Sequence, residues 1–162
     1  MGRASVSHKR RITMLFQRIN RTDPEKIFII VRNSWSSAAL ADGYCVQWDF
    51  TTDKDGVGVT QPTGMATNLG NACAGIAAEA IASGDYGLVQ VYGYHAAVHA
   101  RANTTASNIV LGGGIRPSLA GGVWAVESAA ISGTKNYDPI GFALSIWSSW
   151  TSTTIKAFIK AL

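Results

Sequence analysis

The sequence predicts an all-β fold, in which a small β-barrel or sandwich-like domain follows an extended basic N-terminal arm. Short β-branched and aromatic segments recur along the chain, and turns rich in Gly, Ser and Asn separate them at intervals of roughly ten residues. Of the 162 residues, 67 are Ala, Gly, Ser or Thr, and 47% are hydrophobic. Low hydrophobicity and high charge are typical of disorder, so this composition argues against a disordered chain.

The arm, residues 1–26, differs in charge from the rest of the chain. It carries seven Lys or Arg and two acidic residues, a net charge of +5. Residues 27–162 carry seven basic and eight acidic residues, a net charge of −1, and we expect them to form a single β-rich domain. A basic arm on a nearly neutral body favours an acidic partner, which is nucleic acid, lipid headgroups or an acidic protein groove.

An apolar stripe runs through the arm, because Ile12, Leu15, Phe16 and Ile19 recur with helical spacing. Two turns of isolated helix are marginal in water, so a helix here needs a surface to fold against. A membrane-surface helix, an arm docked in a protein groove and a disordered tail are the alternatives, and whether the arm is helical or extended stays open. We expect it to bind a partner through Lys9, Arg10, Arg11, Ile12, Leu15, Phe16, Arg18, Ile19 and Arg21.

Strand-like segments begin at Ile27, where residues 27–31 form a β-branched and aromatic run. Residues 44–50 alternate in the manner of a strand, and the polar turn at 52–56 leads into residues 57–60, which predicts a hairpin. Ala propensity leaves a helix open at 72–82, although Gly75 favours a strand there. Further strands are expected at 74–81, 86–94, 97–101, 115–118, 124–127, 140–147 and 154–159.

The chain is poor in charge, with 15% charged residues against about 25% in an average soluble protein. Residues 86–100 and 139–155 contain no Lys, Arg, Asp or Glu. An exposed β-prone segment without charge favours aggregation unless it is paired in a sheet or covered by a partner. We therefore expect barrel closure, oligomerisation or both; a monomer covered by Ser and Thr is the alternative.

The motifs of catalysis are missing, and we expect no enzyme. There is no nucleophile elbow, P-loop or dinucleotide fingerprint in the sequence. Residues 112–114 are a Gly run that precedes a strand, which favours a turn over a phosphate-binding loop. Residues 53–56 resemble part of a calcium loop, but Thr51 and Pro62 occupy its first and last ligand positions.

The histidines and cysteines predict no metal site. On a strand, His95 and His99 lie on one face but over ~13 Å apart, too far to share a metal ion. We expect no metal, no cofactor and no small-molecule substrate. Cys45 and Cys73 lie in apolar segments and are expected to be buried free thiols, with one disulfide as the alternative.

Membrane association and secretion are not expected. No apolar run approaches the ~20 residues that a membrane-spanning helix needs. Residues 12–16 are too short an apolar stretch for a secretory signal, because polar Gln17 and Arg18 follow directly.

Several segments resemble the small decoration (cement) proteins of tailed-phage capsids. Residues 30–33 and 42–49 are similar to the opening hairpin of that family, and residues 140–144 to its closing strand. The most specific part of the resemblance is Ala82-Ser83-Gly84-Asp85-Tyr86-Gly87-Leu88-Val89-Gln90-Val91-Tyr92-Gly93, and residues 74–77 add to it. The arm is longer than that family leads us to expect.

The resemblance implies a virion structural protein with a small β-rich domain. Such a protein binds the outer surface of the shell formed by the major capsid protein, usually as a homotrimer, and stabilises the shell against packaged DNA. It is made in the host cytoplasm and resides on the capsid exterior. Cementing requires no active site, only a rigid body and many weak contacts repeated by symmetry.

Two binding functions are the alternatives. In a nucleic-acid-binding β-barrel, the arm would neutralise phosphates while Trp35, Trp48 or Tyr92 stacks on bases. The net charge of the body and the lack of Lys or Arg between its aromatic residues make nucleic acid the less favoured partner. A carbohydrate-binding module would use Trp147 and Trp150, for which packing is the simpler explanation.

Overall fold

The computed structural model describes residues 25–53, 55–62, 72–101, 109–118, 125–128, 139–147 and 153–161. These residues form strands and no α-helix, which confirms the predicted all-β fold. None of them belongs to a helix long and apolar enough to cross a membrane. The strands are β1 (Ile27–Asn33), β2 (Cys45–Trp48), β3 (Gly58–Thr60), β4 (Cys73–Ala77), β5 (Tyr86–Ala100), β6 (Gly114–Ser118), β7 (Ala125–Ser128), β8 (Gly141–Ala143) and β9 (Thr153–Lys160).

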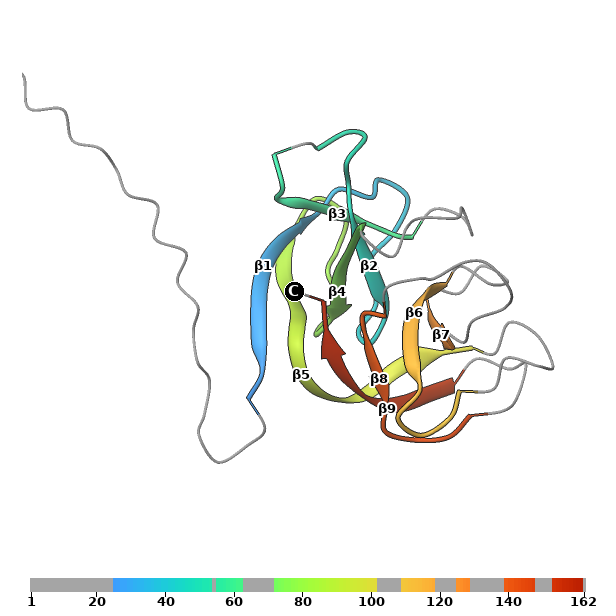
Figure 1. Cartoon of the computed structure of the whole chain (residues 1–162). Helices are drawn as coiled ribbons and strands as arrows, with labels where there is room; N and C mark the ends of the chain where they lie inside the picture. The colour runs from blue at the N-terminus through green and yellow to red at the C-terminus, as the bar shows by residue number, and fades with distance from the viewer. Residues whose placement is uncertain are drawn as a thin grey trace, which may run out of the picture.

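Hydrogen bonding between the strands closes two rings that share one strand. The first ring runs β1-β3-β2-β4-β5 and closes because β1 also pairs with β5. The second ring runs β5-β7-β6-β8-β9 and closes because β9 pairs with β5. Figure 1 shows the long, curved β5 passing from the strands of the first ring to those of the second. Ring closure pairs the backbone N–H and C=O groups along the edges of β5, a strand whose uncharged sequence would otherwise favour aggregation.

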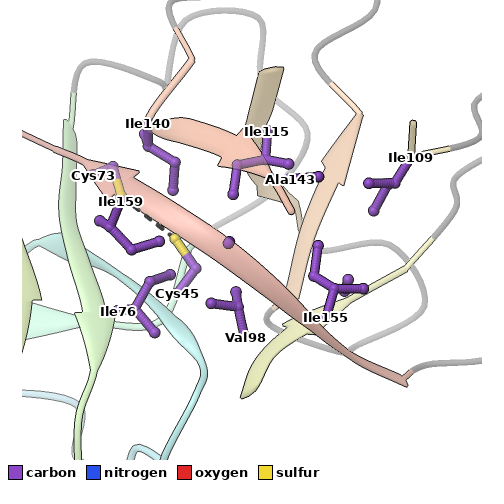
Figure 2. Packing of buried hydrophobic residues seen from close by; sticks show 12 residues of the cluster. Cys45, Cys73, Ile76, Val98, Ile109, Ile115, Ile140, Ala143, Ile155 and Ile159 are labelled. Carbon is purple, nitrogen blue, oxygen red and sulfur yellow. Dashed lines mark hydrogen bonds between the residues drawn. The ribbon is translucent and has the colours of Figure 1, made fainter. Parts of the chain in front are cut away.

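Each ring encloses its own apolar cluster. Nine buried residues of the first ring form one cluster, and a second cluster of twelve residues lies in the second ring (Figure 2). β2 contributes to both, because adjacent residues point to opposite faces: Cys45 packs in the second cluster and Val46 in the first. β4 does the same with Ile76 and Ala77. This shared wall explains why every residue of β4 is buried and why they are mostly small.

Two glycines permit close approaches of backbone. Gly75 has φ +139°, and a Cβ at this position would lie 2.4 Å from the carbonyl oxygen of Gln90 on the paired strand. Gly93 has φ +101°, and a Cβ there would lie 2.0 Å from the carbonyl oxygen of Glu25. Glycine at position 75 therefore lets β4 pass close to β5, which settles the strand against the helical alternative.

The sequence places most strands correctly and misses some boundaries. The hairpin prediction is confirmed, because β2 and β3 pair antiparallel. The segments expected at 86–94 and 97–101 form one strand, since β5 continues through a register shift between His95 and Val98. The prediction of a strand at 140–147 was wrong beyond Ala143, because β8 ends there and the backbone bends at residues 144 and 145. The strand predicted at 74–81 ends at Ala77.

The two cysteines are free and buried, as expected. Their Sγ atoms lie 3.4 Å apart, drawn as a dashed line in Figure 2, within the range of a sulfur hydrogen bond. The hydrogen bond that Cys45 shares with Cys73, together with burial, raises the pKa of the Cys45 thiol well above its usual value. A thiol that stays protonated is a poor nucleophile, so this residue contributes packing rather than chemistry.

Candidate functional site

A pocket of about 770 Å³ lies at the end of the first ring where β1 finishes. Its walls are the ends of β1 and β2, the segments that follow these two strands, one residue of β3 and the turn before β5. It is lined by Arg32, Asn33, Ser34, Trp35, Ser36, Gln47, Trp48, Asp49, Phe50, Thr51, Thr52, Asp53, Asp55, Thr60, Ser83 and Gly84. Aromatic rings and polar groups therefore face the same space, a combination that is usual in binding pockets.

Asn33 holds the wall that carries Trp35. Its side chain is fully buried, and Nδ2 donates to the carbonyl oxygens of Ala38 (3.1 Å) and Ile81 (2.9 Å). Its Oδ1 accepts the backbone N–H of Trp35 at 2.9 Å, while Ser83 Oγ donates to the carbonyl oxygen of Trp35 at 2.7 Å. The backbone of Trp35 is thus fixed on both sides, so the indole enters the pocket from a rigid segment.

Asp49 holds the opposite wall in the same way. Its carboxylate is 4% exposed and accepts hydrogen bonds from the hydroxyls of Ser34 (2.7 Å), Thr51 (2.8 Å) and Thr52, and from the backbone N–H groups of Thr51 and Thr52. Burial by itself raises the pKa of this carboxyl, but the hydrogen bonds outweigh burial and hold the pKa well below its usual range. An ionised Asp49 therefore orders the turn that presents Phe50.

The remaining groups make the pocket aromatic and acidic. Trp35 and Trp48 are half-buried against the first apolar cluster, and Phe50 is 51% exposed. The hydrogen bond between the carboxyls of Asp53 and Asp55 raises the pKa of Asp53, with burial and mutual repulsion adding to it, and lowers the pKa of Asp55.

The charge balance of this pocket decides which ligands it suits. Its described lining holds three Asp and one Arg, a net charge of −2, and Lys54 lies outside the described residues. Arg32 Nε donates to the carbonyl oxygen of Gly84 at 3.2 Å. A negative pocket repels phosphates, so the indoles of Trp35 and Trp48 are poorly placed to stack on nucleic-acid bases. A cationic segment with apolar side chains is complementary instead.

Two apolar patches lie on the outside of the rings. The second-ring patch consists of Val110, Leu111, Phe142, Leu144 and Ile146, of which Ile146 is 68% exposed and Leu111 66%. These residues are neighbours because Ile109 pairs with Trp147 and Gly114 with Phe142, which brings residues 110–113 alongside 143–146. The first-ring patch consists of Ile30, 71% exposed, and Tyr86, 65% exposed, on the paired strands β1 and β5.

Aromatic rings extend the second-ring patch along the outer face of the sheet. Phe142 stacks on Phe158 with ring centroids 5.1 Å apart, and Tyr92 meets Phe158 edge-on at 5.1 Å. At the far side of this row, Lys26 Nζ lies 6.0 Å from the centroid of the Tyr94 ring. Contiguous exposed apolar surface of this kind is typical of protein interaction sites.

The predicted partner-binding residues of the arm, Lys9 to Arg21, lie outside the described residues, as does Trp150. Trp147 is half-buried against the second cluster, so the described structure gives it a packing role. Among the described residues no group of three or more His, Cys, Asp or Glu is placed to hold a metal ion.

The two histidines lie in different surroundings on β5. The ring of His99 stacks on Tyr44, with centroids 4.4 Å apart. Burial lowers the pKa of His95, an effect that Asp42 opposes and Lys26 reinforces.

Sequence reasoning missed the polar frame of the pocket. Neither Asn33 nor Asp49 was predicted to hold a turn, and the segment 44–50, which contains Asp49, was predicted only as an alternating strand. The signal that could have found these residues is local, because Asn33 stands two residues before Trp35, and Asp49 stands two and three residues before Thr51 and Thr52. Asx side chains commonly accept hydrogen bonds from residues two and three positions later. Asn33 accepts one from the N–H of Trp35, and Asp49 accepts one from the N–H of Thr52.

Comparisons with known proteins found little. No protein-family model matches the chain, and no curated protein matches it. Among solved structures, the N base of the head fiber gp8.5 of bacteriophage phi29 is similar, with a TM-score of 0.47 and 13% sequence identity. The match covers 84% of this chain and 95% of that one. Because both the score and the identity are low, we base the function on the residues of this chain alone.

Proposed function

We propose that this protein is a virion structural protein, a capsid decoration (cement) protein that binds the outer surface of the major capsid protein shell as a homotrimer and stabilises it. The observation that carries this is the second-ring patch: five exposed apolar side chains on a closed β-body that is poor in charge. Such a surface gains free energy when a second protein covers it, by roughly 25 cal/mol for each Å² of apolar area buried.

The body suits cementing because its binding surfaces stand on rigid strands. Phe142 lies on β8, whose ladders to β6 and β9 fix its backbone on both sides. The two patches lie on different rings, so one can face the shell while the other faces a neighbouring copy. Residues Lys9 to Arg21 of the arm add a basic segment for the acidic surface of the shell or of a neighbour.

Purified virus particles offer the direct test. Particles that contain the native chain are banded on a density gradient, and the molar ratio of the chain to the shell protein is measured. We expect a fixed ratio near one copy for each shell subunit. A few copies for each particle would indicate a portal, tail or fibre component, and absence from particles would contradict a virion role and favour salt-dependent nucleic-acid binding.

A matched pair of variants then locates the shell contact. Ile146→Glu places a charge in the second-ring patch, whereas Ala80→Glu places the same charge on an exposed turn between β4 and β5. We expect Ile146→Glu to lower the affinity for particles stripped of the native chain at least tenfold and Ala80→Glu to leave it unchanged. Equal affinities of the two variants would remove the second-ring patch from the shell contact, and native mass spectrometry of both reports whether the trimer is kept.

A further inference from the structure

We propose that the basic arm of one copy, residues 1–24, binds in the acidic aromatic pocket of a second copy, so that neighbouring copies exchange arms. This inference deepens the proposed function, because it names the partner surface of the arm within an assembly of this chain. It concerns contacts between copies and can be tested in the absence of any capsid.

Charge complementarity is the first argument. The described lining of the pocket carries Asp49, Asp53 and Asp55 against Arg32, whereas residues 1–24 carry six Lys or Arg and one Asp. Asp49 uses its oxygens for hydrogen bonds within the wall, so the acceptor oxygens at the rim come from Asp53 and Asp55, whose carboxyls also share a hydrogen bond with each other. Guanidinium groups match such carboxylate acceptors well, with charge-assisted hydrogen bonds.

Apolar complementarity is the second argument. The arm alternates its basic residues with Ile12, Leu15, Phe16 and Ile19, so a segment of it presents both kinds of side chain at once. The pocket matches that mixture, since the rings of Trp35, Trp48 and Phe50 stand beside the carboxylates. Arg side chains also stack on aromatic faces, which gives the arm a second mode of contact with the indoles.

The arm begins at the end of β1 opposite to the pocket, and its length allows it to reach a second copy. The backbone of Glu25 packs against Gly93, and Lys26 lies over Tyr94, at the start of β1. The pocket lies at the other end of β1, beyond Arg32, about 20 Å away along the strand. An extended chain of 24 residues spans up to about 80 Å, so the arm is long enough to reach the pocket of a neighbouring copy.

Cross-linking between full-length chains tests arm exchange. One chain carries Thr13→Cys in the arm, and a second, differently tagged chain carries Ser36→Cys on the exposed rim of the pocket. The native Cys45 and Cys73 are buried, so the unmodified chain serves as the background for a short bismaleimide reagent. We expect mixed chains to yield a cross-linked species that carries both tags.

Charge variants show whether the link depends on the proposed contact. Asp53→Asn with Asp55→Asn in the pocket chain should lower the cross-link yield about fivefold, the loss expected for exposed charge pairs. Arg10→Glu with Arg11→Glu in the arm should lower it similarly, and combining these arm changes with Asp53→Lys and Asp55→Lys should restore it. The combined variants would not regain the cross-link yield if the changes in the pocket or in the arm acted only by disturbing the fold.

Three results would overturn arm exchange. The first is a link that forms only within one chain that carries both cysteines. The second is a yield that is unchanged by the Asn variants, and the third is an equal yield with Ala80→Cys outside the pocket in place of Ser36→Cys. The gradient experiment on particles is independent of these results, so failure of arm exchange and failure of the capsid role can be told apart.

Discussion

The two rings share β5 but stabilise their interiors differently. Among the described residues four polar side chains are buried: Asn33, Gln47 and Asp49 lie on β1, on β2 and directly after β2 in the first ring, and Gln90 lies on the shared strand β5. Gln90 Nε2 donates to the carbonyl oxygens of Tyr92 and Tyr94, both at 3.1 Å. Apart from Gln90 on the shared strand, no polar side chain in the described part of the second ring is as buried, and its cluster consists of aliphatic residues and the two cysteines.

This difference matches what each ring presents on its outside. A pocket with ordered loops needs backbone groups held in fixed directions, and buried polar side chains provide that through hydrogen bonds. A surface that docks by apolar contact needs only a rigid sheet behind it, which close packing supplies. The second ring even leaves two buried polar atoms, His99 Nδ1 and Trp147 Nε1, without a hydrogen bond among the described residues.

A cavity in the second ring should cost the most stability. Ile159 is fully buried and pairs with Gly93 and Gly141 on either side. Ile159→Ala should lower the free energy of unfolding by about 3–4 kcal/mol, because the glycines on both sides offer no side chain to fill the space. Urea denaturation followed by far-ultraviolet circular dichroism measures this, and Lys160→Ala on the exposed face is the control, expected within about 0.5 kcal/mol of the parent.

A single transition at all wavelengths is expected for Ile159→Ala, since β5 ties the two rings together. Two separate transitions would show that the rings unfold independently and that the shared strand does not couple them.

The next largest loss of unfolding free energy is expected when the buried Asn33 side chain of the first ring is removed. Asn33→Ala removes both hydrogen bonds that Nδ2 donates, to the carbonyls of Ala38 and Ile81, and the one that Oδ1 accepts from Trp35; the carbonyl of Ile81 keeps its hydrogen bond from the N–H of Leu40. We expect a cost of about 2–3 kcal/mol in unfolding free energy and a red shift of tryptophan fluorescence as the Trp35 segment loosens. Exposed Ser37→Ala is the matched control; a cost below about 0.5 kcal/mol would mean that the first ring does not depend on this side chain.

The smallest expected effect is a dependence on pH. Asp49 has a pKa below its unfolded value of about 3.9, so it contributes stability above pH 4 that is lost as the pH falls towards the folded pKa. Asp49→Asn lacks this group, and the stability difference between parent and variant should therefore shrink between pH 5 and about pH 2.5. Denaturation midpoints at several pH values measure it, and a constant difference would contradict the assigned cause.

The strands were predictable where local patterns are strong. The run at residues 27–31, the hairpin after residue 50 and the strands near 115–118 and 154–159 follow from β-branched residues and turn signals, and all are present. The length of β5 was not predictable, because the pairing of its second half with β9 overrides the small, low-propensity residues Ala96 and Ala97. The pocket was not predictable either, since its walls come from segments far apart in the chain.

Local patterns in the sequence are enough to predict an all-β body of low charge, a basic arm, buried thiols at Cys45 and Cys73, and uncharged strands. These follow from composition and from patterns within a few residues, where backbone preference and hydrophobicity act locally. Three features come from the folded chain alone: the strands close into two rings around β5, β2 and β4 form a wall between two cores, and Trp35 and Trp48 share a pocket with Asp53. Those features depend on pairings between residues distant in sequence, which no local pattern encodes.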